Sequence, residues 1–235
     1  MITRTRLAVA LLTFIVGLAG VWLTDLGSQL TGAVIDRLMP TPTLDAPADV
    51  ALSDSTADTY AVYSAVLNTM FVRDGARLLV IERQINGGCP ACEDPTIAQQ
   101  MGQSEPFIPT VQKAMQAAQP DTLNDYLAQT KHEQQLKWLF DLKGRYVLVE
   151  ASELNKLGSR EFTGLGDFWR NFYARYPAAH GLISFSNVGF NQAHTQAFVY
   201  VVNTCGGLCG SGRYVLLEKR AGAWEIIDQM GLWVS

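Results

Sequence analysis

The stretch QAFVYVVNTCGGLCGSGRYVLLEK, residues 196–219, holds two apolar, β-branched runs on either side of a glycine-rich turn. Such runs joined by a short connection predict two antiparallel strands. Runs of the same kind lie before and after it, at residues 182–190 and 224–234, and the turns between them contain Asn191 and Ala221 with Gly222. The C-terminal part of the chain therefore predicts a four-stranded antiparallel meander, with strands at 182–190, 196–203, 213–219 and 224–234.

The residues before this meander predict helices that pack on it, which gives an α+β fold. Apolar residues from Tyr60 to Met70 follow a helical spacing, and the aromatic residues from Phe168 to Tyr176 do the same until Pro177 ends the pattern. The last of these helices therefore has a broad aromatic face. Other helices are predicted at 107–118, 121–139 and 152–157, and strand-like segments at 77–85 and 145–151.

The N-terminal segment predicts a membrane anchor. Arg4 and Arg6 precede an uncharged, mostly apolar stretch, residues 7–24, which as a helix would be about 27 Å long. A cleaved signal peptide is the alternative. The positive-inside rule places the rest of the chain in the periplasm or outside the cell. We expect an anchor at 1–25, a linker rich in Pro, Ala, Asp, Ser and Thr at 26–57, and a single exported α+β domain at 58–235.

The overall composition excludes several classes of protein. The chain has 235 residues, of which 48% are hydrophobic, enough to bury a sizeable core. Its 18 basic residues against 22 acidic ones give a net charge of −4, and no basic run is present. We therefore expect contact with a membrane through the N-terminal helix and none with nucleic acid. No cofactor-binding motif occurs, so no cofactor is expected.

The C-terminal half resembles an uncharacterised family of bacterial proteins. The resemblance runs from an aromatic helix ending in Tyr-Pro, through a Ser-x-Val-Gly-Phe strand and a Cys-Gly-x-Leu-Cys-Gly-x-Gly turn, to a terminal Trp-Val-Ser. It extends more weakly upstream, to residues 121–154. It implies a shared fold unit but neither a reaction nor catalytic residues. The matching positions are Tyr176, Pro177, Ser186, Val188, Gly189, Phe190, Cys205, Gly206, Leu208, Cys209, Gly210, Gly212, Trp224 and Trp233.

The four cysteines allow three interpretations. Cys89 and Cys92 form a C-x-x-C unit after a strand, as in dithiol oxidoreductases, but Glu93 and Asp94 beside them disfavour a thiolate. All four could hold zinc as two glycine-flanked pairs. In an exported domain, however, oxidation competes for the thiols, which favours disulfides. The residues alone leave the three connectivities open.

The family resemblance adds a pairing. It includes Cys205 and Cys209 but not the CPAC unit, which implies a local disulfide between Cys205 and Cys209. We expect the glycines of this turn to supply the positive φ angles of a tight ring; these are Gly206, Gly207, Gly210 and Gly212.

Other candidate chemistry is sparse. The sequence has no Gly-x-Ser-x-Gly elbow and no His-Glu-x-x-His unit. For His132, His180 and His194 we expect solvated or hydrogen-bonded roles. Glu161 and Asp167, near the aromatic helix, are interpreted as helix caps as readily as acids.

An aromatic pocket is the remaining candidate site. The residues Trp169, Tyr173 and Tyr176 of the aromatic helix, together with Trp224 and Trp233 of the meander, could line an apolar pocket. The alternative is that they form ordinary core. We expect a membrane-anchored envelope protein whose exported domain binds a small ligand or an envelope protein without catalysis. The alternative function is a thiol-disulfide or zinc protein that uses CPAC.

Overall fold

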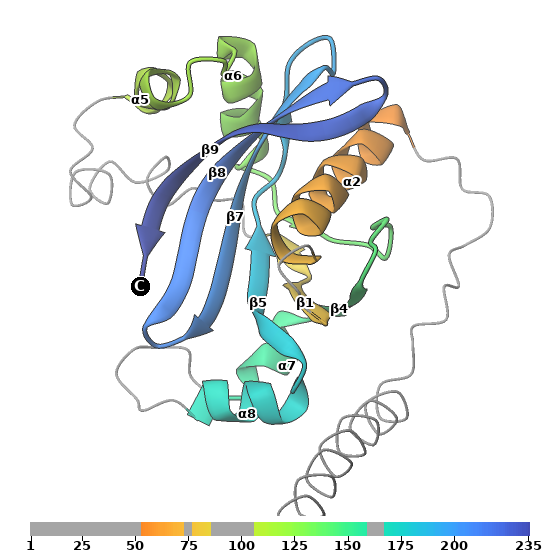
Figure 1. Ribbon diagram of the computed structural model, residues 1–235, viewed down its shortest axis with the longest axis vertical. Helices are drawn as coiled ribbons and strands as arrows, with labels where there is room; N and C mark the ends of the chain where they lie inside the picture. Colours follow the sequence, from red (N-terminus) through yellow and green to blue (C-terminus); the bar gives the residue numbers. More distant parts are fainter. Residues whose placement is uncertain (1–52, 73–76, 86–105, 159–166) are drawn as a thin grey trace, which may run out of the picture. The chain divides into compact units, whose positions relative to one another are not determined.

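The computed structural model describes residues 53–72, 77–85, 106–158 and 167–235, all within one compact unit that spans 50–235. These residues form an α+β fold around one large sheet with the strand order β4-β1-β5-β7-β8-β9, while β6 pairs with β7 (Figure 1). A separate two-stranded sheet pairs β2 with β3. The strands are β1 (Leu78–Glu82), β2 (Gln84–Ile85), β3 (Gln134–Gln135), β4 (Arg145–Val149), β5 (Ala179–Phe185), β6 (Gly189–Phe190), β7 (Gln196–Gly206), β8 (Cys209–Arg220) and β9 (Ala223–Val234).

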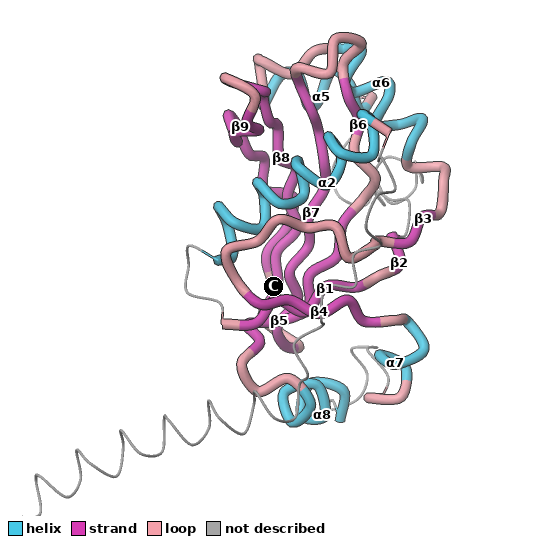
Figure 2. The backbone as a smooth tube through the Cα atoms, turned by 90° about the vertical axis from the view of Figure 1, so that its right-hand side faces the viewer, coloured by secondary structure: helices cyan, strands magenta, loops and turns pink. Residues whose placement is uncertain are grey.

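The helices lie on both sides of the sheet and at one end of it (Figures 1 and 2). Helices α7 and α8 lie at the end of the sheet opposite to α6. The helices are α2 (Asp54–Leu67), the π-helical turn η1 (Asn68–Val72), α5 (Phe107–Ala114), α6 (Pro120–Gln129), α7 (Ala151–Asn155) and α8 (Asp167–Arg175).

The sheet is mixed, which corrects the expectation of a purely antiparallel one. Strands β5, β7, β8 and β9 are antiparallel neighbours, as the meander predicts, but β1 runs parallel to both β4 and β5. Every residue of β1 is buried. A short strand with a continuous apolar run is typical of parallel strands covered on both faces.

Alternate residues of β7 face two different cores. Ala197, Val199 and Val201 belong to a cluster formed with α2 and with the segment from Leu136 to Phe140. Phe198 and Tyr200 belong to a second cluster, formed with α5 and α6. The period of two residues along a strand places these sets on opposite faces of the sheet. The sheet is thus the middle layer between α2 and the pair α5 and α6.

Helix α2 begins before the domain boundary expected at residue 58. The Ser53 hydroxyl accepts a hydrogen bond from the Thr56 N–H at 3.3 Å, which is an N-cap contact, and the helix starts at Asp54. The last residues of the predicted linker are therefore helical.

Only about the first half of the helix expected at 121–139 is helical. Helix α6 ends at Gln129, and Leu136 lies after the short strand β3. The Asn187 amide donates hydrogen bonds to the carbonyls of Gln129 and His132, at 2.7 and 2.6 Å. These carbonyls are satisfied by a residue distant in sequence rather than by a further helical turn.

The local disulfide between Cys205 and Cys209 is confirmed, with a Cα–Cα distance of 5.0 Å. The expected reason for its glycines is wrong, because none of the four has a positive φ. A Cβ on Gly212 would instead lie 2.3 Å from both Trp233 Nε1 and Tyr200 Oη. At least this glycine is required for close packing rather than for backbone conformation.

Four sequence predictions lie outside the described residues. These are the membrane anchor at 1–25, most of the linker at 26–57, the CPAC unit with Cys89 and Cys92, and the role of Glu161 as a cap or an acid. Within the ranges that the structure describes, no helix combines the length and the hydropathy of a membrane span.

Candidate functional site

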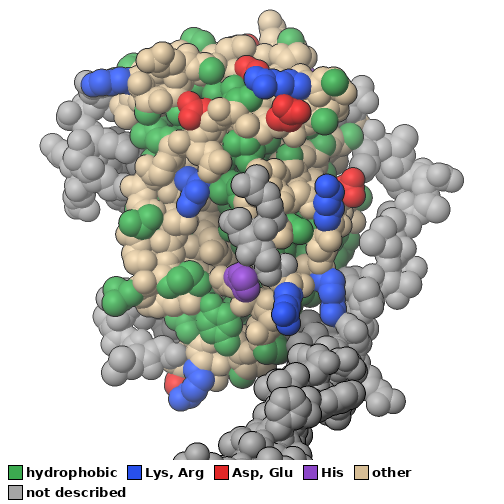
Figure 3. All heavy atoms as spheres, viewed as in Figure 1, with side chains coloured by type: hydrophobic (Ala, Val, Ile, Leu, Met, Phe, Trp, Pro, Cys, Tyr) green, Lys and Arg blue, Asp and Glu red, His purple; other side chains and the backbone are tan. Residues whose placement is uncertain are grey.

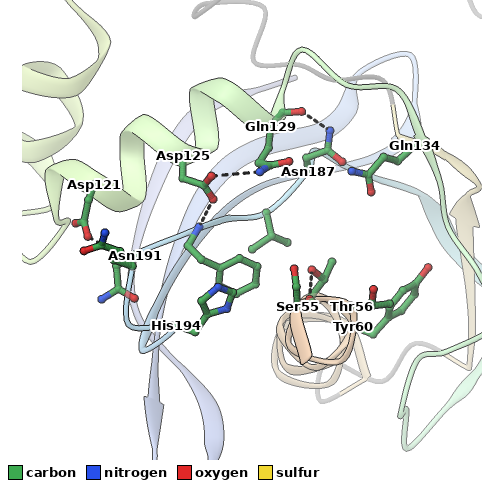
Figure 4. A pocket seen from close by; sticks show the side chains of 14 residues that line it. Ser55, Thr56, Tyr60, Asp121, Asp125, Gln129, Gln134, Asn187, Asn191 and His194 are labelled. Carbon is green, nitrogen blue, oxygen red and sulfur yellow. Dashed lines mark hydrogen bonds between the residues drawn. The ribbon is translucent and has the colours of Figure 1, made fainter. Parts of the chain in front are cut away.

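A polar cleft of about 680 Å³ lies between α2, α6 and the turn that joins β6 to β7 (Figure 4). We call it the α2–α6 cleft. Its size falls within the range of small-molecule sites. The described residues that line it are Ser55, Thr56, Thr59, Tyr60, Asp121, Asp125, Gln129, Gln134, Asn187, Val188, Phe190, Asn191, Gln192 and His194.

Two aspartates on α6 hold the β6–β7 segment in place. Asp125 accepts hydrogen bonds from the Phe190 N–H at 2.8 Å and from the Gln129 side-chain amide at 3.2 Å. Asp121 accepts one from the Gln192 N–H at 3.2 Å. Since the spacing of four residues places both carboxylates on one side of the helix, they form one wall of the cleft.

The turn after β6 is shaped by its own side chains. Asn191 accepts hydrogen bonds from the backbone N–H groups of Thr195 and Gln196, at 2.8 and 2.9 Å. His194 adopts a left-handed backbone conformation, with φ of 53°, and its ring stacks on Phe190 at 4.8 Å between centroids. The left-handed turn thus places the imidazole at the cleft, opposite α2 (Figure 4).

A second contact joins this turn to α2. Asp58 accepts hydrogen bonds from the Lys219 ammonium at 2.6 Å and from Trp224 Nε1 at 3.3 Å. Its other carboxylate oxygen lies 3.5 Å from His194 Nδ1. The Asp58 charge is therefore balanced by Lys219, which is not among the described residues that line the cleft.

The α2 wall carries hydroxyl groups. The Tyr60 hydroxyl accepts a hydrogen bond from the Lys137 N–H at 2.6 Å. Burial raises the pKa of Tyr60. The hydrogen bond from Lys137 and the nearby Arg83 charge each lower this pKa, but by less. Tyr60 is therefore a neutral hydrogen-bonding group at physiological pH. Ser55, Thr56 and Thr59 lie on the same helix and add further hydroxyls.

Asn187 contributes a buried acceptor at the end of the cleft near Gln129 and Gln134 (Figure 4). The residue is 2% exposed, and its Oδ1 has no hydrogen-bond partner in the part of the chain that the structure describes. A buried acceptor without a partner costs on the order of 1 to 3 kcal/mol. This oxygen is thus a position at which a hydrogen-bond donor would be stabilising.

The two carboxylates of the cleft are tied into hydrogen bonds with its own backbone and amides. No serine or cysteine among the described lining residues has a histidine as a hydrogen-bond partner. No group of three or more His, Cys, Asp or Glu residues that could hold a metal ion occurs within the described ranges. What the arrangement offers a ligand is hydrogen bonds.

A second cavity, of about 580 Å³, lies over β7, β8 and β9 beside η1. It contains Arg213, which reaches Gln229 Oε1 and Ser211 Oγ at 3.4 Å each, together with His180 and the apolar Met70 and Phe71. On the molecular face shown in Figure 3, the described basic side chains are scattered rather than gathered. This cavity has fewer convergent polar groups, so the α2–α6 cleft is the better candidate.

The five residues of the predicted aromatic pocket lie in three different places. Trp169 and Tyr173 contact each other on α8, and Tyr176, the residue after this helix, packs on Phe172; the Tyr173 hydroxyl donates to the Cys205 carbonyl at 2.8 Å. Trp224 packs in the core on the α2 side. Trp233 donates to the Tyr200 hydroxyl at 2.8 Å. None of the five is among the described residues that line either cavity.

Sequence reasoning missed most of the cleft. The sequence predicts that Asn191 and His194 lie in turns. It gives no signal that Asp121, Asp125 and Asn187 share a site. The spacing of Asp121 and Asp125 within one predicted helix is the signal that could have found one wall. Nothing local links that wall to α2, because the two are joined only by the tertiary fold.

Comparison of the chain with family models, curated proteins and solved structures found no match in any of the three. The resemblance to an uncharacterised bacterial family therefore stays a prediction from the motifs quoted above.

Proposed function

We propose that this chain is a membrane-anchored protein of the cell envelope whose exported domain binds a small polar ligand without catalysis. The observation that carries the proposal is the α2–α6 cleft, in which side chains from two helices and a turn converge on a space large enough for a small molecule. Its carboxylates fasten the turn, which supports binding rather than reaction.

Two further features support the location. The Cys205–Cys209 disulfide is the kind of bond that persists in oxidising compartments. The apolar stretch at residues 7–24, preceded by two arginines, fits an anchor that leaves the domain outside the cytoplasm.

Thiol trapping on the full chain, recovered separately from the membrane and soluble fractions of its own cells, tests the location. The protein is alkylated before and after reduction, and its intact mass is measured. We expect a mass that includes the N-terminal segment, and Cys205 and Cys209 that react only after reduction. Recovery in the soluble fraction with both thiols reduced would contradict the proposal. Reduced Cys89 and Cys92, or bound zinc, would favour the thiol or zinc function instead.

A further inference from the structure

The α6 wall of the α2–α6 cleft and the nearby Asn187 offer hydrogen-bond acceptors, while the α2 wall offers hydroxyl groups. Asp121 uses one carboxylate oxygen for Gln192, and Gln129 uses only its amide N–H₂ for Asp125. In the described part of the chain, the other oxygen of Asp121, Oε1 of Gln129 and Oδ1 of Asn187 accept no hydrogen bond. A ligand that complements these oxygens must be rich in donors.

The lining of the cleft carries two carboxylates and one imidazole, that of His194. The carboxylates are those of Asp121 and Asp125, and none of the described lining residues is a lysine or an arginine. Two basic groups near the lining residues are already paired, Lys219 with Asp58 and Arg83 with Glu150. Because like charges repel and unlike charges attract, the two carboxylates disfavour anions and favour cations, most strongly at low ionic strength.

The cleft also has a small apolar part. Val188 and Phe190 are among the described lining residues, both are almost fully buried, and Phe190 stacks on the His194 ring. A short hydrocarbon segment can contact these side chains while its polar end reaches α6. This combination of a small apolar contact and two carboxylates matches a cation with a short hydrocarbon chain.

We propose that the ligand of the α2–α6 cleft is a small organic amine. Its ammonium group, with three donors and no acceptor, is held by Asp121 and Asp125, and its remaining donors reach Gln129 Oε1. The inference rests on the proposed function, because it names the chemical class that the same cleft binds.

Three four-carbon probes of similar length separate charge from hydrogen bonding: putrescine is a dication, butanediol is neutral and succinate is a dianion. Each is titrated into the full chain at low ionic strength, and the backbone amide NMR signals of Phe190 and Gln192, which donate to the two aspartates, report binding. We expect putrescine to shift both signals at a concentration at least roughly tenfold below that of butanediol, and succinate to leave them in place.

Asp121→Asn provides the matched test, since asparagine keeps an oxygen for the Gln192 N–H and loses only the charge. We expect it to weaken putrescine binding roughly fivefold. The control is Asp167→Asn, which removes the same charge from an exposed site on α8 and should leave the affinity unchanged.

Equal binding of butanediol and putrescine in the cleft would overturn the amine inference and leave the binding function standing. Equal losses in both asparagine variants would overturn it too, because the attraction would then come from the net charge of the chain. If none of the probes moves the two amide signals, both the amine inference and the cleft as the binding site fail.

Discussion

At the scale of single residues, close contacts decide which side chains can be changed. Gly212 lies on β8 where a Cβ would meet Trp233 Nε1 and Tyr200 Oη, two atoms that are hydrogen-bonded to each other. We expect Gly212→Ala to lower the free energy of unfolding by on the order of 1 to 3 kcal/mol. Urea denaturation measures it. The control is Gly231→Ala on β9, where a Cβ meets no atom within 4 Å; an equal loss there would contradict the packing explanation.

Buried tyrosines give the fold a pH dependence. Burial raises the pKa of Tyr63 and of Tyr214 far above the ordinary value for tyrosine. In the unfolded chain each hydroxyl ionises near its ordinary pKa of about 10. The stability from keeping the two neutral is fully present below that pH and is lost above it. We expect the free energy of unfolding to fall by up to about 1.4 kcal/mol per pH unit for each of the two.

Tyr63→Phe checks this assignment. The variant loses the hydrogen bond from the Tyr63 hydroxyl to the Ser186 carbonyl, so its stability at neutral pH should be lower by about 1 kcal/mol. Above pH 10 the slope of stability against pH should decrease by about one proton. Urea denaturation of wild type and variant, measured from neutral pH to above pH 10, gives both the stability difference and the slope. An unchanged slope would mean that Tyr63 ionises in the folded state.

At the scale of elements, the disulfide hairpin supports α8. The bridge closes a short ring between β7 and β8, and Tyr173 of α8 donates to the Cys205 carbonyl within it. By chain entropy the bridge contributes about 2 kcal/mol. We expect the double variant Cys205→Ser, Cys209→Ser to lose about this amount. Wild-type protein measured with a thiol reductant should match the variant, and a reductant effect that persists in the variant would assign the stability to other cysteines.

The contact between α2 and the sheet predicts a second element effect. Asp58 is 15% exposed and bonds to Lys219 and Trp224. Hydrogen bonds to charged groups contribute more than neutral ones, so Asp58→Asn should lower the free energy of unfolding by about 1.5 kcal/mol. Asp167→Asn, which breaks an exposed pair with Arg170, should change it by less than about 0.5 kcal/mol. Thermal and urea unfolding would show whether the two differ.

The sequence allowed the prediction of elements more readily than of their pairing. The meander strands were predictable because their side chains alternate within one short segment, and α8 because its aromatic residues recur before Pro177. The parallel pairing of β1 with β4 and β5 depends on contacts between distant segments. The end of α6 depends likewise on Asn187, 58 residues further along from Gln129.

At the scale of the whole molecule, the site arises from the assembly of these elements. The α2–α6 cleft unites α2, α6 and the β6–β7 turn, and no one of them carries a recognisable motif. The disulfide, by contrast, was predictable from the family resemblance, because that resemblance includes Cys205 and Cys209 without the CPAC unit. A local feature can be inferred from a short motif, whereas a cleft between layers requires the fold.

The most direct test of the binding function is native mass spectrometry of the full chain purified from its own cells. We predict that wild-type protein carries a non-covalent small molecule, released chemically unchanged on denaturation. It should be absent from Ser55→Trp, which fills the cleft from α2, and retained by Ser152→Trp, an exposed site on α7. If the native masses of wild type and Ser55→Trp differ only by the mass of the substitution, the cleft holds no ligand and the binding function is contradicted. If the bound molecule is chemically converted during incubation, the domain is not a non-catalytic one.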